Sequence, residues 1–129
     1  MTIISPQGLT AGLEPAVALF RSLGDPTRLA ILRRLALGEA KVSDLIANLG
    51  LAQSTVSAHV ACLRDCGLVL GRPEGRRVFY SLTHPELMDL LAQTEVLLVA
   101  TGNAVALCPV YGDGSAEKSN PSRVGLAAR

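Results

Sequence analysis

The sequence contains no tryptophan, and aromatic residues make up only 3% of it, against 49% hydrophobic residues in all. A core must therefore be built from Leu, Val, Ile and Ala, and we expect packed helices. Polar and charged groups interrupt every apolar run well before the roughly 18 residues that a membrane span requires. The N-terminus also has no basic segment ahead of its short apolar stretch. We therefore expect no transmembrane helix, no secretory signal and a cytoplasmic location.

A large net charge is missing as well, since 12 Lys and Arg stand against 11 Asp and Glu, which leaves +1. The charges are unevenly spread, because residues 64–77 hold several arginines and few acidic residues. Local charge, rather than the total, is therefore what bears on nucleic-acid binding. A chain of 129 residues has room for one domain, whose modest core could be extended by dimerisation.

Three cysteines are an odd number in a small chain, which argues against a disulfide framework and favours free thiols or metal ligands. Cys62 and Cys66 lie four residues apart in a predicted helix, and Cys108 stands alone in the polar tail. Helical residues at this spacing point within about 40° of each other, so two thiolates could chelate one ion. The alternative is that the pair consists of small buried hydrophobes, as free cysteines often are.

Apolar residues at helical spacing predict short helices over residues 17–23, 26–37 and 42–49, each followed by a glycine. Asp25 is the expected N-cap of the second of these, since Pro26 after it has no N–H to lose. A fourth periodic stretch, residues 53–64, follows the third helix after a tight turn. Two short helices joined in this way are a helix-turn-helix signal.

Residues 68–82 then alternate and are rich in β-branched and aromatic types, which predicts a β-hairpin with its turn at Pro73-Glu74-Gly75. Thr83 and Glu86 have the spacing of a capping box and open a last helix that reaches about Thr101. This helix carries an apolar stripe that is wide for a surface helix and that we expect to form a dimer: Leu87, Leu90, Leu91, Thr94, Leu97 and Leu98.

The order of these elements predicts a mainly α fold with a β-hairpin wing, a homodimeric winged helix-turn-helix. The DNA-binding and dimerisation domain is expected over residues 14–102. A flexible N-terminal arm, residues 1–13, would precede it. The C-terminal tail, residues 103–129, would carry Cys108 and be disordered in its distal part.

The stretches DPTRLAILRRL, DLIANLGLAQSTVSAHVACLRDCGLV and GRRVFYSL resemble the ArsR/SmtB family of metal-sensing repressors, over about residues 14–102. The cysteine pair with a lone tail cysteine is most similar to the cadmium- and lead-sensing branch of that family. The resemblance implies a repressor that binds near-palindromic operator DNA as the apo dimer and releases it when a soft metal binds. It implies Cys62, Cys66 and Cys108 as ligands, with Cys108 from the same or the other protomer.

Three thiolates without a convincing fourth ligand suit Cd(II) or Pb(II) better than zinc, which prefers four ligands. As(III), Hg(II) and Zn(II) remain open as inducers. His59 lies on the flank of the cysteines, where it could ligate a metal, pack against the domain or contact phosphate. A thiol redox or persulfide switch in the same fold is the alternative function. A thiol enzyme is disfavoured because no cysteine stands at a phosphate-type loop or a C-x-x-C helix start.

The partner expected from this pattern is double-stranded operator DNA, with no membrane and no small organic substrate. Polar residues of the second helix of the motif would face the major groove, and arginines beside the hairpin turn would reach phosphate or the minor groove. The predicted DNA contacts are Gln53, Ser54, Thr55, Ser57 and His59 on the helix, and Arg72, Arg76 and Arg77 on the hairpin.

One residue departs from the family pattern, because Ala52 stands where the family usually has a Ser or Thr cap for the recognition helix. Ala accepts no such hydrogen bond, a loss on the order of 1 kcal/mol. Either the helix start is loose, or Gln53 or Ser54 caps it from a shifted boundary.

Overall fold

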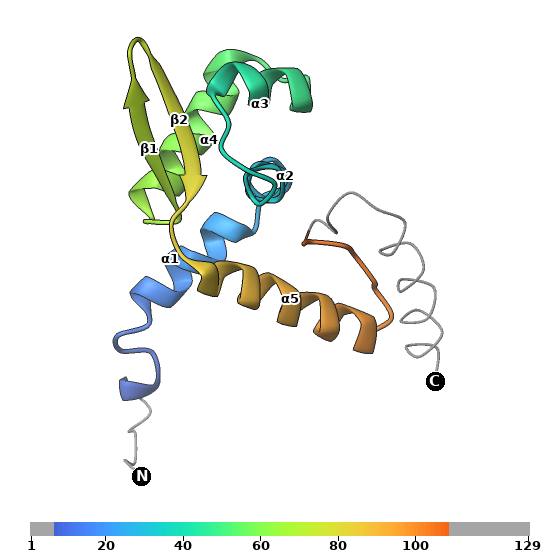
Figure 1. Cartoon of the computed structure of the whole chain (residues 1–129). Coiled ribbons are helices and arrows are strands. Elements are labelled where there is room, and N and C mark those ends of the chain that lie inside the picture. Colours follow the sequence, from blue (N-terminus) through green and yellow to red (C-terminus); the bar gives the residue numbers. More distant parts are fainter. Residues whose placement is uncertain (1–6, 109–129) are drawn as a thin grey trace.

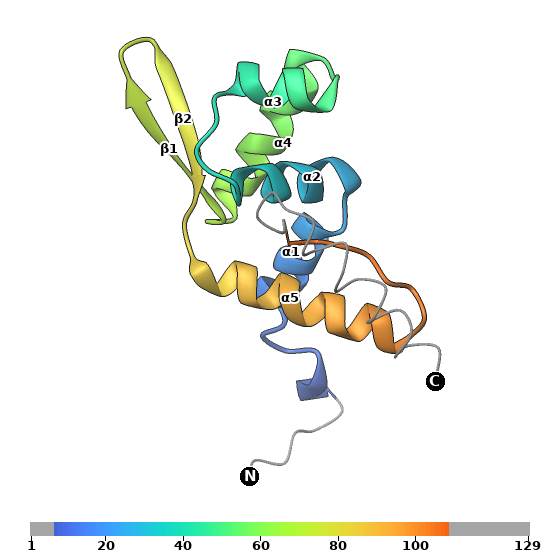
Figure 2. The ribbon, with the colours of Figure 1, turned by 45° about the vertical axis from the view of Figure 1, so that its right-hand side comes forward.

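A computed structural model describes residues 7–108 of the chain. Within these residues the elements confirm the predicted winged helix-turn-helix, with the hairpin beside α3 and α4 and with α5 at the far end from the wing tip (Figures 1 and 2). In chain order they are η1 (Gln7–Leu9), α1 (Glu14–Leu23), α2 (Pro26–Leu35), α3 (Val42–Leu49), α4 (Gln53–Asp65), β1 (Val69–Glu74), β2 (Arg77–Leu82) and α5 (Pro85–Ala100).

The core is aliphatic, as the composition predicts. Val56, Val60 and Leu63 form the buried stripe of α4, and they cluster with Ile31 and Leu32 of α2, which are fully buried. Full burial of a side chain of this size contributes about 1.5–3 kcal/mol. The stripe therefore holds α4 against α2 and α3 and decides which of its sides faces outward.

The start of α2 confirms the predicted cap, while its end is earlier than predicted. The carboxylate of Asp25 accepts the backbone N–H of Arg28 at 2.9 Å, and this hydrogen bond lowers the pKa of Asp25. The helix ends at Leu35 instead of about Leu37. The N–H of Gly38 bonds back to the carbonyl of Leu35, three residues earlier, so the chain leaves the helix through a tighter turn.

The turn between α3 and α4 depends on Gly50, which ends α3 in the left-handed conformation with φ 68°. The next helix begins at Gln53 with Ala52 as its N-cap, and no side chain caps it. The boundary is therefore not shifted, and the missing cap noted in the sequence is a feature of the fold.

The wing is an antiparallel hairpin in which Glu74 pairs with Arg77, so its two-residue turn is Gly75-Arg76. Gly75 has φ 65°, which this kind of tight turn requires. The predicted turn at Pro73-Glu74-Gly75 is correct only at Gly75, since Pro73 lies inside β1 opposite Val78. Proline is tolerated there because β1 is an edge strand with an unpaired side.

A short β-bridge, which the sequence did not predict, attaches the wing to the loop before α3. The N–H of Ala40 donates to the carbonyl of Tyr80 at 3.1 Å, and the N–H of Tyr80 donates back at 2.8 Å. Through these two hydrogen bonds, Ala40 is added to the hairpin as a single residue that lies beside β2. It sets the position of the wing relative to α2 and α3.

The last helix differs from its prediction in two ways. The capping box is wrong, because the Thr83 hydroxyl donates to the carbonyl of Gly67 at 2.6 Å, and His84 is the N-cap. Leu87 and Leu91 of the expected dimer stripe are buried in the core of their own chain, whereas Leu97 is 63% exposed. Glu95 is buried beside them, which the sequence pattern missed.

The predicted flexible arm and disordered distal tail fall largely on residues 1–6 and 109–129, outside the described residues. Within the described part of the arm, Gln7–Leu9 forms the 3₁₀ turn η1. No helix of residues 7–108 is long and apolar enough to cross a bilayer.

The uncapped start of α4 yields a stability prediction. Ala52 has φ −65° and ψ 150°, the extended N-cap geometry, so Ala52→Ser should place a hydroxyl within reach of the free N–H groups of the first turn. The free energy of unfolding should rise by about 1 kcal/mol, measured by urea denaturation at fixed protein concentration. Ala47→Ser inside α3 is the control and should give no gain. A midpoint for Ala52→Ser at or below that of the parent would contradict the prediction.

Candidate DNA interface and cysteine positions

The first turns of α4 present polar side chains to solvent. Gln53, Ser54 and Thr55 are exposed, and Ser57 is half-buried one turn on. None of them belongs to the buried stripe, so the same packing that fixes α4 leaves these groups outward. Amide and hydroxyl groups both donate and accept, as contacts to base edges and phosphates require. The structure therefore brings together the recognition-helix residues that the sequence predicted.

The wing tip adds positive charge next to the start of α3. Arg76 and Arg77 are exposed and share a shallow hollow of about 260 Å³ with Lys41 and Ser43. Its lining is Lys41, Val42, Ser43, Arg76, Arg77, Val78 and Tyr80. Three cations around one hollow suit a phosphate group. Lys41 and Ser43 were not among the predicted contacts, although Lys41 directly precedes a predicted helix start.

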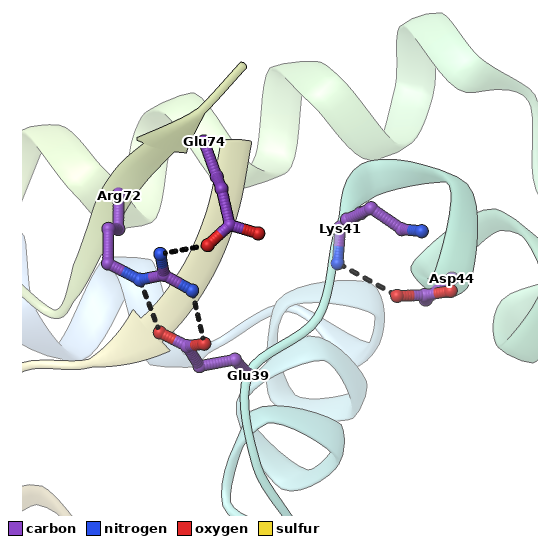
Figure 3. A network of polar contacts seen from close by, with 5 residues as sticks. All are labelled: Glu39, Lys41, Asp44, Arg72 and Glu74. Carbon is purple, nitrogen blue, oxygen red and sulfur yellow. Dashed lines mark hydrogen bonds and ion pairs between the residues drawn. The ribbon is translucent and has the colours of Figure 1, made fainter. Parts of the chain in front are cut away.

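Arg72, the third predicted wing contact, is held by two carboxylates (Figure 3). Its Nε and Nη2 donate to the two oxygens of Glu39, at 3.1 and 2.8 Å, and Nη1 donates to Glu74 at 2.9 Å. The hydrogen bonds from Arg72 lower the pKa of Glu39. The same bonds, to Glu39 first and then to Glu74, raise the pKa of Arg72. A phosphate would have to compete with these carboxylates, unlike at Arg76 and Arg77.

The contacts of Arg72 also connect the wing to the loop before α3. The guanidinium carbon lies 5.2 Å from the centre of the Phe79 ring, and Nζ of Lys41 lies 5.7 Å from it. Cation–π attraction of this kind adds to the bond between Arg72 and Glu39, which lies in the loop before α3. Beside it, Asp44 accepts the N–H of Lys41 at 3.0 Å and caps α3 (Figure 3).

His59 is packed against the start of α2. Its Nδ1 lies 3.2 Å from Nη1 of Arg28 and 3.9 Å from the carboxylate of Asp25. A guanidinium only donates, so Nδ1 accepts and the ring proton resides on Nε2. In this arrangement neither nitrogen has a free lone pair for a metal. Of the three roles considered for His59, the structure favours packing and leaves an Nε2–H donor for a phosphate.

Arg28 connects three helices through this contact. Besides reaching His59 on α4, its guanidinium donates to the carbonyls of Ser22 and Arg21 at 2.7 and 3.0 Å, in the last turn of α1. The carbonyl of Arg21 also accepts the N–H of Gly24 at 3.2 Å, and a cation beside the last carbonyls of a helix is favourable. The end of α1 is thereby fixed beside α4.

Cys62 and Cys66 lie at the C-terminal end of α4. Cys62 is half-buried in the last turn, and Cys66 is the exposed C-cap, one residue past the helix in which it was predicted. Its N–H still bonds to the carbonyl of Cys62 at 3.1 Å, so the helical turn continues through it and both side chains share a flank. The sulfur of Cys66 also lies 2.7 Å from the hydroxyl of Ser22, a buried residue of α1.

Cys108 lies apart from this pair. It follows α5, where the chain turns back alongside that helix (Figure 2), and its sulfur contacts the carbonyl of Met88 at 3.7 Å. Within residues 7–108, no group of three or more His, Cys, Asp and Glu side chains is arranged to hold a metal ion. The structure thus brings Cys62 and Cys66 onto one flank but does not bring Cys108 to them.

The outer faces of α1 and α5 carry large exposed apolar side chains. Phe20 and Leu97 are each 63% exposed, and Val96 is 57% exposed. Leu9, Leu13 and Val17 are exposed before and within α1, and Val105 is exposed after α5. Large exposed apolar side chains of this kind are typical of an interaction surface.

A two-helix motif with an outward polar face, beside a basic wing, defines a DNA-binding regulator of the winged helix-turn-helix class. The sequence matches the family model "Bacterial regulatory protein, arsR family" over residues 25–70. It is 40% identical to a probable mercury resistance operon repressor of Streptomyces lividans, over 73% of this chain and 74% of that protein. The chain therefore belongs to the arsR family, and it is a transcriptional regulator rather than an enzyme.

A second relative is the HTH-type transcriptional regulator CmtR of Mycobacterium tuberculosis, 44% identical over 67% of this chain and 75% of that protein. The NMR structure of that protein, a cadmium metal-sensor, gives a TM-score of 0.52 at 45% identity, over 60% of this chain and 80% of that chain. A homodimeric winged helix-turn-helix DNA-binding domain from Mycobacterium bovis gives 0.63 at 31% identity, over 75% and 89%.

The exposed wing arginines yield a prediction about DNA binding. Arg76→Ala combined with Arg77→Ala should weaken binding to operator and to random duplex by similar factors, because phosphate contacts carry no sequence information. The slope of log affinity against log salt should fall by about 2, one for each lost contact. Fluorescence anisotropy titrations over a range of salt concentrations measure both effects.

Two further variants sharpen the wing experiment. Arg21→Ala removes an exposed charge from α1 and should leave the slope unchanged. Ser57→Ala on α4 should weaken operator binding more than random binding, as direct base readout requires. An unchanged slope for the double wing variant would show that these arginines do not touch phosphate.

Proposed function

We propose that this chain is a cytoplasmic, homodimeric repressor that binds operator DNA as the apo protein and dissociates when Cd(II) or Pb(II) binds Cys62, Cys66 and Cys108. The observation that carries the proposal is the position of Cys62 and Cys66 at the C-terminal end of α4, the helix whose first turns hold the exposed polar residues. One rigid helix thus carries both the DNA contacts and two soft ligands. The likeness to a cadmium sensor and to a mercury resistance repressor supports a thiophilic metal as inducer.

The mechanism follows from where the two sulfurs lie. Chelation fixes both side chains at the C-terminal end of α4, and Cys66 must adjust its contact with Ser22 of α1 to do so. Because α4 is a single helix of 13 residues, a displacement at one end is transmitted to the DNA-facing turns. A coupling of about 1–3 kcal/mol would lower operator affinity about 5- to 150-fold.

The coordination number decides which ions are candidates. Three thiolates satisfy Cd(II) and Pb(II), whereas Zn(II) prefers a fourth ligand and His59 is already engaged by Arg28. Hg(II) and As(III) are also thiophilic, so they belong in the same titration.

The DNA contacts we propose are Gln53, Ser54, Thr55 and Ser57 on α4, with His59 contributing through Nε2–H. On the wing, Arg76 and Arg77 bind phosphate together with Lys41, and Arg72 reaches it by exchanging one of its carboxylate partners. Burial of the exposed faces of α1 and α5 across a two-fold axis would place two α4 helices about 34 Å apart, as a symmetric operator requires.

The metal ligands are tested by single substitutions. Cys62→Ser and Cys66→Ser should each abolish tight cadmium binding while leaving a folded dimer that still binds operator, since a hydroxyl is a poor ligand for a soft ion. Cys108→Ser should weaken the metal site and uncouple it from operator release. Sulfur-to-metal charge-transfer absorption and operator anisotropy, recorded in the same titration, measure both properties.

The outcomes separate the metal sensor from its redox alternative. Operator release by cadmium that a chelator reverses supports the proposal. Retention of stoichiometric tight binding by both single variants of the pair would refute the site. Release only by an oxidant or persulfide, reversed by a reductant, would assign the cysteines to thiol chemistry.

The dimer is tested on the exposed apolar faces. Leu97→Glu, alone or with Phe20→Glu, should yield monomers with little operator affinity, because a charge in the buried interface is strongly unfavourable. Leu91 is unsuitable for this purpose, since it lies in the core of its own chain. Leu37→Glu, at another exposed apolar position, is the matched control and should remain dimeric in sedimentation experiments. An operator-competent Leu97→Glu monomer would show that α5 forms no interface.

A further inference from the structure

The segment after α5 is fastened to two helices by hydrogen bonds. The N–H groups of Leu107 and Cys108 both donate to Oε2 of Glu95 on α5, at 2.5 and 2.7 Å. Nη1 of Arg33 on α2 donates to the carbonyl of Ala106 at 2.8 Å. Three successive residues of the tail are therefore held in place through their backbone.

Glu95 occupies a position where the pattern of α5 calls for an apolar residue. It follows Leu87 and Leu91 at a spacing of four, and it is 7% exposed, nearly as buried as those two. A buried carboxylate is unfavourable unless hydrogen bonds replace its lost hydration. The two tail N–H groups supply such bonds, and bonds to an ionised acceptor are among the stronger ones.

The position in which Cys108 is held does not suit a metal ligand. The side chains of Leu107 and Cys108 pack against the core, and the thiol donates to the carbonyl of Met88. A metal-bound sulfur is a thiolate with no proton to donate, so at this place it would face a carbonyl oxygen unfavourably. Ligation therefore requires Cys108 to leave its contact with Met88.

We propose that Glu95 is a latch: it holds Cys108 away from Cys62 and Cys66 in the metal-free protein, and a bound metal must open it to recruit the third thiolate. This inference rests on the function proposed above. Glu95 is here a positioning residue that acts through the backbone of Cys108. Arg33, through Ala106, is the second and weaker part of the same latch.

The latch sets the affinity and the selectivity of the sensor. When the binding-competent state is only a fraction of the population, the apparent dissociation constant is the intrinsic one divided by that fraction. A closed latch therefore weakens every metal that uses Cys108. An ion that is satisfied by two sulfurs leaves the latch closed, whereas an ion that gains strongly from a third thiolate opens it.

The latch itself is tested without metal. Full-length apo-protein is pulsed with N-ethylmaleimide, and mass spectrometry follows Cys108 and Cys62 separately. In Glu95→Ala, Cys108 should react about tenfold faster or more, because charge-assisted hydrogen bonds are lost. Glu95→Gln keeps one carbonyl acceptor and should fall between Ala and the parent.

Two further variants complete the comparison of alkylation rates. Asp89→Ala removes an exposed carboxylate from the same helix and should match the parent. Arg33→Ala changes an exposed residue that does not contribute to the core, so it tests the latch even if Glu95→Ala folds poorly; Cys108 should react faster in it as well.

The link to the metal is tested by cadmium titration of the same proteins. Glu95→Ala should bind cadmium about tenfold or more tightly than the parent, because the free energy of opening is no longer required. In a Cys108→Ser background the same substitution should give no gain, since the latch acts only through Cys108. A general destabilisation of α5 would not produce this dependence on Cys108.

The outcomes distinguish the two hypotheses. Unchanged alkylation of Cys108 in Glu95→Ala and Arg33→Ala would overturn the latch and leave the metal sensor standing. Weaker cadmium binding in both variants would also overturn it, since Glu95 would then present Cys108 to the metal. Faster alkylation in a protein whose parent binds no cadmium would support the restraint of Cys108 by Glu95, but it would refute the proposed sensor and with it the opening of the latch by metal.

Discussion

The burial of one stripe of α4 is the constraint on which the rest of the structure depends. Val56, Val60 and Leu63 face the core together, and the helical period then leaves no freedom to the other sides of the helix. The polar first turns face outward, and Cys62 and Cys66 lie on a flank next to α1. The burial of these three apolar side chains thus determines both which side of α4 is available to DNA and where the two thiols lie.

Polar contacts, rather than further apolar burial, set the angles between the elements around that core. Arg28 joins the end of α1 to His59 of α4, and the bridge between Ala40 and Tyr80 joins the wing to the loop before α3. Most of these groups are partly exposed, so each contributes little to the free energy of unfolding. Hydrogen bonds are directional, however, so they fix orientation where aliphatic packing alone would tolerate several.

The cysteines are divided between a core helix and the segment that follows α5. Cys62 and Cys66 follow directly from the core stripe of α4, whereas the backbone N–H of Cys108 donates to Glu95 and its neighbour Leu107 packs against the core. A segment outside the regular elements opens at a smaller free energy than a core helix. In the function proposed here, that difference lets a metal rearrange the tail without unfolding the domain.

The wing shows why some expectations from sequence fail. Pro73 indicated a turn because proline is common there, but the edge position of β1 tolerates it inside a strand. Thr83 had the spacing of a cap, yet its hydroxyl meets the carbonyl of Gly67, which only the folded chain brings near. In both cases a contact distant in sequence overrode a local preference.

Local signals in the sequence determined the helices, the hairpin and the family, because periodicity, the Asp25-Pro26 start and glycine stops act over a few residues. The shared flank of Cys62 and Cys66 was equally readable, since it depends only on helical geometry. Tertiary structure decided three other features. They are the hydrogen bonds of Arg72 to two carboxylates, the contact of His59 with Arg28 and the burial of Glu95. Each of these depends on a partner from another element, and the free energy of a polar group is set by the partner it meets rather than by its neighbours in sequence.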